Sequence, residues 1–164
     1  IGLCLYSSAN NFERSDSQVM AGNKIKEGFV KAIEACAPFE YKQQQSFLVF
    51  SQGYLSWVLQ TEGVSQMLAC WDEMLAKLGL TDPRTKDTVS QLWMLVIRAH
   101  INQPSHQRSN DVIRSLFEKG SERCGSDEIF SEYRDFEMSL GNVQAAGSII
   151  WRMQQIKAKK IKLK

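Results

Sequence analysis

Cysteine and histidine are the side chains of this sequence with the widest chemistry, because thiolates and imidazoles act as nucleophiles, bases and metal ligands. The chain carries two histidines, His100 and His106, and four cysteines, at positions 4, 36, 70 and 124. None of the cysteines forms a C-x-x-C pair, and the histidines do not complete a ligand set with them. The spacing therefore predicts small buried cysteines in a reducing compartment. A nucleophilic pair of His100 with Cys70 or Cys124 stays open as an alternative.

The rest of the sequence carries no catalytic motif that we could recognise. There is no G-x-x-x-x-G-K-[ST], no G-x-G-x-x-G, no H-E-x-x-H and no G-x-S-x-G. The carboxylate pairs Asp72-Glu73 and Asp127-Glu128 are expected on helix surfaces or in first turns, where they face water or complement the helix dipole. We therefore expect a protein that is not an enzyme, has no cofactor or metal, and takes no small-molecule substrate.

Positive charge is concentrated at the C-terminal end. The net charge is +2, but the last eight residues, KAKKIKLK, carry five lysines and no acid, so the rest of the chain is mildly acidic. A basic segment binds phosphates nonspecifically and in a salt-dependent way, although a localisation signal or a solvated helix end explains it equally well. The candidate contacts with RNA or a partner are Arg152, Lys157, Lys159, Lys160, Lys162 and Lys164, with Arg108 in the HQR loop (106–108) and the aromatic Trp151.

We predict that the secondary-structure elements carrying these residues are helices, because helical periodicity dominates and strand-like alternation is nearly absent. No stretch of roughly 18 apolar residues predicts a membrane-spanning helix. Glycines at 63, 125 and 141 are expected in left-handed turns that end helices, with Asn110, Ser126 or Asp127, and Asn142 as N-caps of the helices that follow. We predict about eight helical segments, near residues 2–13, 17–36, 42–61, 64–79, 85–102, 110–124, 127–140 and 142–156.

Short apolar patterns recur along the chain. Residues 113–120, IRSLFEKG, align with residues 146–153, AGSIIWRM, at an offset of 33, so that Leu116 falls on Ile149. Residues 67–74 carry a similar pattern. A mostly aromatic triplet at i, i+3 and i+6 marks the first helix of three of the four predicted pairs: Tyr54, Trp57, Gln60; Trp93, Val96, Ala99; and Phe130, Tyr133, Phe136.

Such a spacing places each triplet on one stripe of its helix, and a single helical hairpin cannot bury that stripe from both sides. Stacked hairpins can, so we predict an all-α fold, an α-solenoid of antiparallel helix pairs. The large apolar residues of these stripes are expected to pack rather than to form a site: Trp93, Phe117, Phe130, Tyr133 and Ile149.

The last pair resembles the half-a-tetratricopeptide (HAT) repeat, a TPR-like motif. The matching residues are Phe130, Tyr133, Phe136-Glu137, Gly141-Asn142, Ala146, Ile149 and Arg152. The sequence departs from the pattern at Ala99-His100, which replaces Phe-Glu, at Glu73, where a basic residue is usual, and at Gly147, which replaces an arginine. The resemblance implies a HAT-like array over residues 1–156, the C-terminal part of a longer protein, followed by a basic tail at 157–164.

The resemblance also implies a function, since HAT proteins are scaffolds in RNA-processing complexes. The chain is similar to HAT components of the small-subunit processome, a nucleolar particle of the nucleus that contains a small nucleolar RNA (snoRNA). We therefore expect a scaffold for rRNA processing and ribosome biogenesis, with partner proteins in a large complex, candidate RNA contact through the tail, and no membrane. Two alternatives stay open: a HAT scaffold of splicing or 3′-end cleavage, and a direct RNA-binding helical module.

Overall fold

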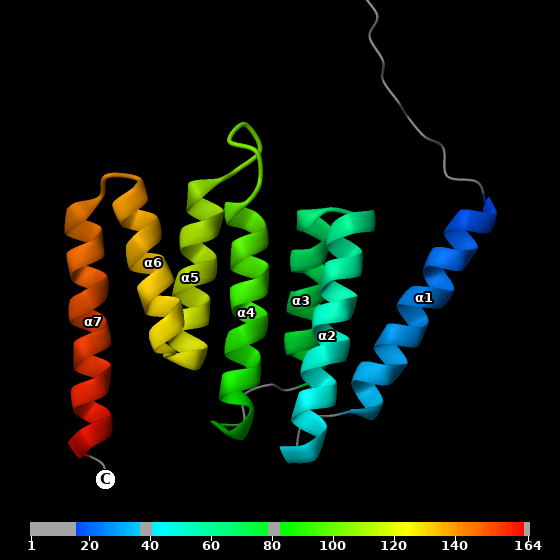
Figure 1. The fold of residues 1–164 in the computed structure, drawn as a ribbon, viewed down its shortest axis with the longest axis horizontal. Coiled ribbons are helices and arrows are strands. Elements are labelled where there is room, and N and C mark those ends of the chain that lie inside the picture. Colours follow the sequence, from blue (N-terminus) through cyan, green and yellow to red (C-terminus); the bar gives the residue numbers. More distant parts are fainter. Residues whose placement is uncertain (1–15, 37–40, 79–82, 163–164) are drawn as a thin grey trace, which may run out of the picture.

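The described part of the chain is entirely helical. A computed structural model describes residues 16–36, 41–78 and 83–162 (Figure 1). Its regular elements are seven α-helices and one 3₁₀ helix, which confirms the predicted all-α class. They are α1 (Asp16–Ala35), α2 (Tyr41–Thr61), α3 (Val64–Leu78), η1 (Pro83–Thr85), α4 (Lys86–Ile101), α5 (Asn110–Cys124), α6 (Asp127–Ser139) and α7 (Val143–Lys162). The predicted helix at 2–13 lies outside the described residues.

The helix ends agree with the predicted glycine turns. Gly63, Gly125 and Gly141 all have positive φ, at 90°, 51° and 78°. One predicted N-cap needs correction. Asn110 is the first residue of α5, and Ser109 precedes it with extended φ and ψ, so its Oγ accepts a hydrogen bond from the backbone of Val112 at 3.4 Å. Asn142 lies directly before Val143, the first residue of α7, as predicted for its N-cap, and its backbone carbonyl accepts from the N–H of Ala146 at 3.0 Å.

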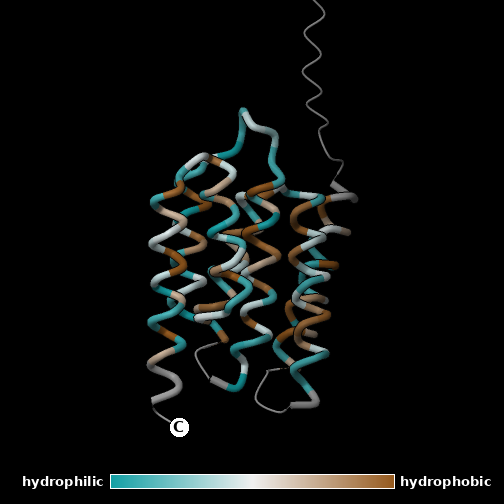
Figure 2. Tube along the Cα trace, turned by 60° about the vertical axis from the view of Figure 1, so that its left-hand side comes forward, coloured by the Kyte–Doolittle hydropathy of each residue, from teal (hydrophilic) through white to brown (hydrophobic). Residues whose placement is uncertain are grey.

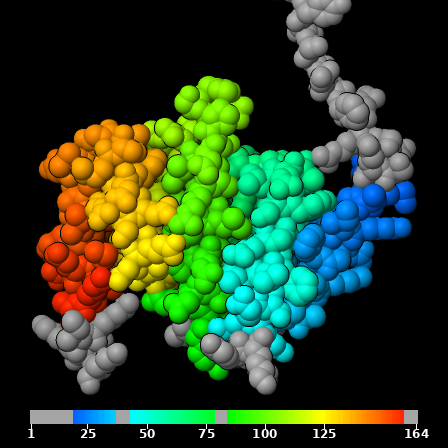
Figure 3. Space-filling view, viewed as in Figure 1, coloured from blue at the N-terminus to red at the C-terminus, as the bar shows by residue number. Residues whose placement is uncertain are grey.

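The helices stand side by side, and each runs antiparallel to the one before it (Figure 1). Every helix contacts its neighbour in the sequence, and α2 also contacts α4. Apolar and polar residues are interspersed along each helix (Figure 2), as expected when only one stripe is buried. Side chains fill the spaces between the ribbons, so that the helices share one continuous surface (Figure 3).

The aromatic stripes predicted from the sequence form the core. Trp93, Phe117 and Phe130 are almost fully buried, and Tyr133 and Ile149 are also buried, which confirms them as packing residues. Trp93 meets Trp71 edge to face with ring centroids 5.5 Å apart, and Phe117 stacks on Tyr133 at 4.8 Å. Both geometries are favourable for aromatic pairs.

The helical spacing of Ile25, Phe29 and Ile33 predicts that they share one buried face of α1, but the structure buries only part of that face. Phe29 packs on Tyr54 and Trp57 of α2, and Ile33 is buried, but Ile25 is 46% exposed. The reason is the inclination of α1, whose N-terminal half leans away from α2 (Figure 1). A periodic sequence indicates which side of a helix is apolar, but not how far along the helix its neighbour reaches.

Gly141 offers a test of the turn between α6 and α7. Replacing Gly141 with alanine is expected to lower the free energy of unfolding by about 1–2 kcal/mol, because a side chain disfavours positive φ. An added Cβ would meet nothing within 4 Å, so crowding does not contribute. Urea denaturation measures the change. Gly28→Ala is the matched control inside α1, where an added Cβ also meets nothing, and it should raise stability by about 0.5–1 kcal/mol. A Gly141→Ala variant as stable as this control would contradict the expectation.

Candidate partner-binding surface

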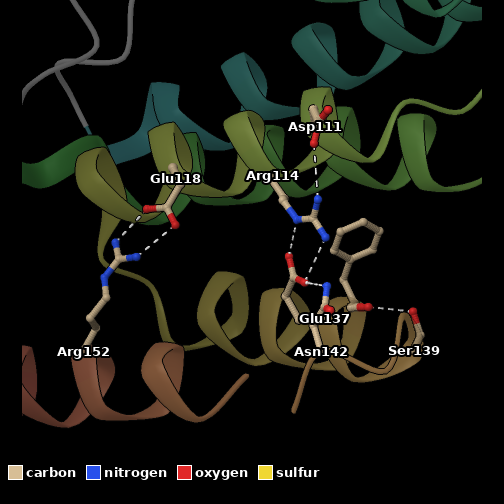
Figure 4. Close-up of polar contacts among 8 residues, drawn as sticks. Asp111, Arg114, Glu118, Glu137, Ser139, Asn142 and Arg152 are labelled. Carbon is tan, nitrogen blue, oxygen red and sulfur yellow. Dashed lines mark hydrogen bonds and ion pairs between the residues drawn. The ribbon is translucent and has the colours of Figure 1, made fainter. Parts of the chain in front are cut away.

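A buried carboxylate joins α5, α6 and the turn that follows α6 (Figure 4). Glu137 is only 1% exposed. Its carboxylate accepts from Nε of Arg114 at 2.7 Å, from Nη2 of Arg114 at 3.2 Å, and from the side-chain amide of Asn142 at 2.7 Å. The backbone N–H of Asn142 also donates to the carbonyl of Glu137 at 2.9 Å. We call Arg114, Glu137 and Asn142 the Glu137 clamp.

The charges of the Glu137 clamp compensate one another. The hydrogen bond from Arg114 holds the pKa of Glu137 below its ordinary value in spite of burial, and Asn142 lowers the pKa further. Asp111 makes a second contact with Arg114 at 3.2 Å from the first turn of α5. The clamp therefore keeps a buried charge ionised, and it ties one helix pair to the next.

A second cluster joins α5, α6 and α7, and Figure 4 shows its pair of Glu118 and Arg152. Arg152 donates from Nη1 and Nη2 to the two oxygens of Glu118 at 2.9 and 2.8 Å. Tyr133 also hydrogen bonds to Glu118, and burial is the main cause that raises the pKa of Tyr133 to about 12. Arg152, and to a lesser extent Tyr133, lowers the pKa of Glu118. We call Glu118, Tyr133 and Arg152 the Glu118 clamp.

Other ion pairs link helices at the surface. Arg98 of α4 donates to Glu132 of α6 at 2.9 Å and to Glu128 at 3.0 Å. Lys157 of α7 lies 2.9 Å from Asp127 at the start of α6. Because these groups are largely exposed, water and salt screen their attraction. These ion pairs link neighbouring helices, but each contributes little to the free energy of unfolding.

The basic residues predicted as contacts divide into two groups. Arg152 and Lys157 are engaged in the ion pairs above, so their charges are partly neutralised within the chain. Lys159, Lys160 and Lys162 belong to α7, which continues without a break across the predicted tail boundary at 156/157. Lys164 lies outside the described residues. The basic segment is therefore largely the end of a long helix.

Arg108 lies far from that helix end. It belongs to the loop between α4 and α5, which projects at the opposite end of the molecule from the C-terminus (Figure 1). The backbone N–H of Arg108 donates to the carbonyl of Pro104 at 3.0 Å, and its side chain is half-buried. The fold therefore does not bring Arg108 and the C-terminal lysines into one patch.

Trp151 is the most conspicuous exposed aromatic residue. It is 61% exposed on α7, and it borders a shallow hollow lined also by Gln144, Gly147, Ser148 and Arg152. Val143, two turns earlier on the same helix, is also exposed. Exposed aromatic side chains are common anchors in protein interfaces, so this face is a candidate docking surface.

Cys70 and His100 do not form the nucleophilic pair left open by the sequence, because each contacts a different group. The hydroxyl of Tyr54 donates to Sγ of Cys70 at 3.3 Å, and Nδ1 of His100 lies 2.9 Å from the carbonyl of Val96. Burial raises the pKa of Cys124 to about 11, which opposes thiolate formation. Among the described residues, no group of three or more histidines, cysteines or acids is arranged to hold a metal ion.

Sequence reasoning missed a small cavity between α1 and α3. It has a volume of about 90 Å³ and an apolar floor that includes Ile33, Tyr54 and Met74. Lys26 and Glu34 on α1, with Glu73 and Lys77 on α3, line its rim. Binding sites for drug-sized ligands enclose roughly 300–1,000 Å³, so this cavity is too small for such a ligand. Only the packing of helices distant in sequence reveals it.

The fold and these surfaces define an all-α protein whose antiparallel helices are joined by polar clamps. None of the described helices is long and apolar enough to cross a membrane. No family model, no curated protein and no solved structure matches this chain.

Proposed function

We propose that this chain is a non-catalytic scaffold of the HAT type, an α-solenoid that holds partner proteins in a nucleolar ribonucleoprotein. The observation that carries the proposal is the burial of the first position of all three aromatic triplets. Tyr54, Trp93 and Phe130, which begin the three aromatic triplets, are all buried. The later positions differ, since Trp57 and Ala99 are half-buried and Gln60 is exposed. The shared burial of the first positions supports stacked, repeated units.

The two clamps support the same proposal. Arg114 and Glu118 are one turn apart on α5, and they bind Glu137 of α6 and Arg152 of α7. The last helix pair is thus fastened to the pair before it by charged groups as well as by apolar packing. A rigid, elongated stack offers a large surface for partners without requiring a catalytic centre.

The particular particle is inferred from resemblance. The blocks YLSWVLQTEGVSQM (54–67), LFEKGSERCGSDEIFSEYRDFE (116–137) and IIWRMQQ (149–155) are similar to the C-terminal array of the U-three small nucleolar RNA-associated protein six. That protein is a component of the small-subunit processome. We propose that this chain acts there, in the nucleolus, during the maturation of 18S rRNA.

Affinity capture from nuclear extract, with and without RNase, tests the function. We expect the U-three RNA and small-subunit processome proteins in the untreated capture, and the proteins to persist after RNase. Recovery of splicing or 3′-end cleavage factors instead would overturn the assignment to this particle. Loss of every partner after RNase would favour the direct RNA-binding alternative.

A tail variant separates protein contacts from RNA contact. Lys159, Lys160, Lys162 and Lys164 are replaced together by glutamine, and Lys157 is kept because it pairs with Asp127. If the tail binds RNA, the salt dependence of RNA affinity should weaken, with a change in log–log slope of up to about 3 for four phosphates on a single strand. For a scaffold that acts through protein contacts, protein capture should persist in this variant.

A further inference from the structure

Gly147 lies inside α7, where glycine is unfavourable. Glycine in a helix interior is about 1 kcal/mol less stable than alanine. A glycine there is often explained by close packing, but a Cβ added to Gly147 would meet nothing within 4 Å. No packing contact among the described residues therefore requires the absence of a side chain at this position.

Trp151 stands one helical turn from Gly147 on the same face. The indole is 61% exposed and borders the hollow above the glycine. The hollow is also lined by Gln144, one turn before Gly147, and by Ser148, which are both uncharged. Its remaining lining residue, Arg152, forms an ion pair with Glu118. A projecting aromatic ring and an adjacent recess thus lie about 6 Å apart along the helix axis.

The equivalent positions on α5 hold charged residues. At the offset of 33, Arg114 corresponds to Gly147 and Glu118 to Trp151. In the two clamps, Arg114 and Glu118 of α5 hold the following helices. Because α7 has Gly147 and Trp151 at the equivalent positions, it has no charged groups there that could hold a further helix pair in the same way. This face of α7 is therefore better matched to an uncharged partner surface than to a further helix pair held by ion pairs.

We propose that a second copy of this chain covers this face, with the two α7 helices antiparallel and Trp151 of each copy in the hollow over Gly147 of the other. If a two-fold axis passes near residue 149, Trp151 of each copy inserts into the hollow of the other. Such symmetry is what a self-complementary dimer interface requires. This proposal does not depend on which particle the scaffold serves.

The charge distribution selects an antiparallel arrangement. Residues 143–151 carry no charge, and residues 157–164 carry five lysines. In this register, the Lys157 backbones of the two copies are separated by about 24 Å along the axis at 1.5 Å per residue, beyond the Debye length of about 8 Å. A parallel arrangement would bring the lysines of both copies together. The lysine segments of the antiparallel dimer also stay available to other partners.

Sedimentation equilibrium of the RNase-treated chain tests the proposal. One helical contact is small for a protein interface, so we expect a concentration-dependent dimer with a dissociation constant on the order of micromolar. Trp151→Ala should weaken dimerisation at least tenfold. Gly147→Leu should also weaken it, because the leucine fills the hollow, while raising the melting temperature of the dilute monomer.

A control variant and a cross-linking test complete the experiment. Gly28→Leu changes a helical glycine on α1 that likewise has open space around it, so it should leave dimerisation unchanged. Single-cysteine substitutions at the exposed residues Gln144 and Gln154 test the register: mixing the two variants should give a disulfide between 144 and 154, rather than between two copies of 144. A chain that stays monomeric at several hundred micromolar would overturn the proposal. A dimer unaffected by Trp151→Ala, or one cross-linked through two copies of 144, would overturn it as well.

Discussion

Replacing Phe117 with alanine is expected to lower the free energy of unfolding by about 3–5 kcal/mol. The side chain is fully buried, stacks on Tyr133 at 4.8 Å, and has the ring of Phe136 at 5.8 Å. Alanine would leave a cavity between α5 and α6 that the surrounding helices fill only in part. The loss should appear as a lower urea midpoint and a lower melting temperature, while far-ultraviolet circular dichroism stays helical below the transition.

Val112→Ala provides the matched control, because Val112 is an apolar residue on the same helix that is 39% exposed. Its effect should be within about 0.5 kcal/mol, as for most surface substitutions. A melting curve for Phe117→Ala that coincides with that of Val112→Ala would refute the assignment of Phe117 to the core.

Replacing Glu137 with glutamine is the second large expected effect. The substitution keeps the side-chain shape but removes the charge that accepts hydrogen bonds from Arg114 and Asn142. Hydrogen bonds to a charged group contribute about 1.5–3 kcal/mol, so we expect a loss of that order at neutral pH. Urea denaturation at pH 7 measures the loss, and Glu122→Gln, at an exposed carboxylate on the same chain, should change stability by less than about 0.5 kcal/mol.

The same substitution should change the response to acid. The folded pKa of Glu137 is lowered from its ordinary value of 4.5, so the unfolded chain binds a proton more readily. The stabilisation is therefore complete above about pH 4.5 and is lost as the pH falls through the folded pKa. Removing this group should make the stability of Glu137→Gln less dependent on pH below 4.5. The dependence should not vanish, because the pKa of Glu118 is also lowered. Parallel acid-unfolding profiles for the two proteins would contradict the role of the clamp.

Electrostatic contacts were the least predictable part of the surface. The sequence predicts Arg152 as a candidate contact because it begins a basic segment, but its guanidinium binds Glu118, 34 residues away in the sequence. The signal that could have found the pair is the repeat itself, since Glu118 and Arg152 lie close to equivalent positions of neighbouring units. Arg98 and Glu132 make a similar long-range pair. Such pairs depend on how helices dock, which a single helix does not encode.

The helices, most of their ends and their apolar stripes follow from the sequence, although α7 extends to Lys162, beyond the predicted boundary at 156. These properties are local: glycines allow positive φ at 63, 125 and 141, and apolar spacings of three and four residues align one face of each helix. Which parts of those faces are covered depends on how the helices pack against one another. Ile25 and Ile33 belong to the same predicted stripe of α1, yet Ile25 is exposed and Ile33 is buried. Burial and ion pairing depend on the inclination and depth of neighbouring helices, because these determine which side chains from distant parts of the chain come within contact distance.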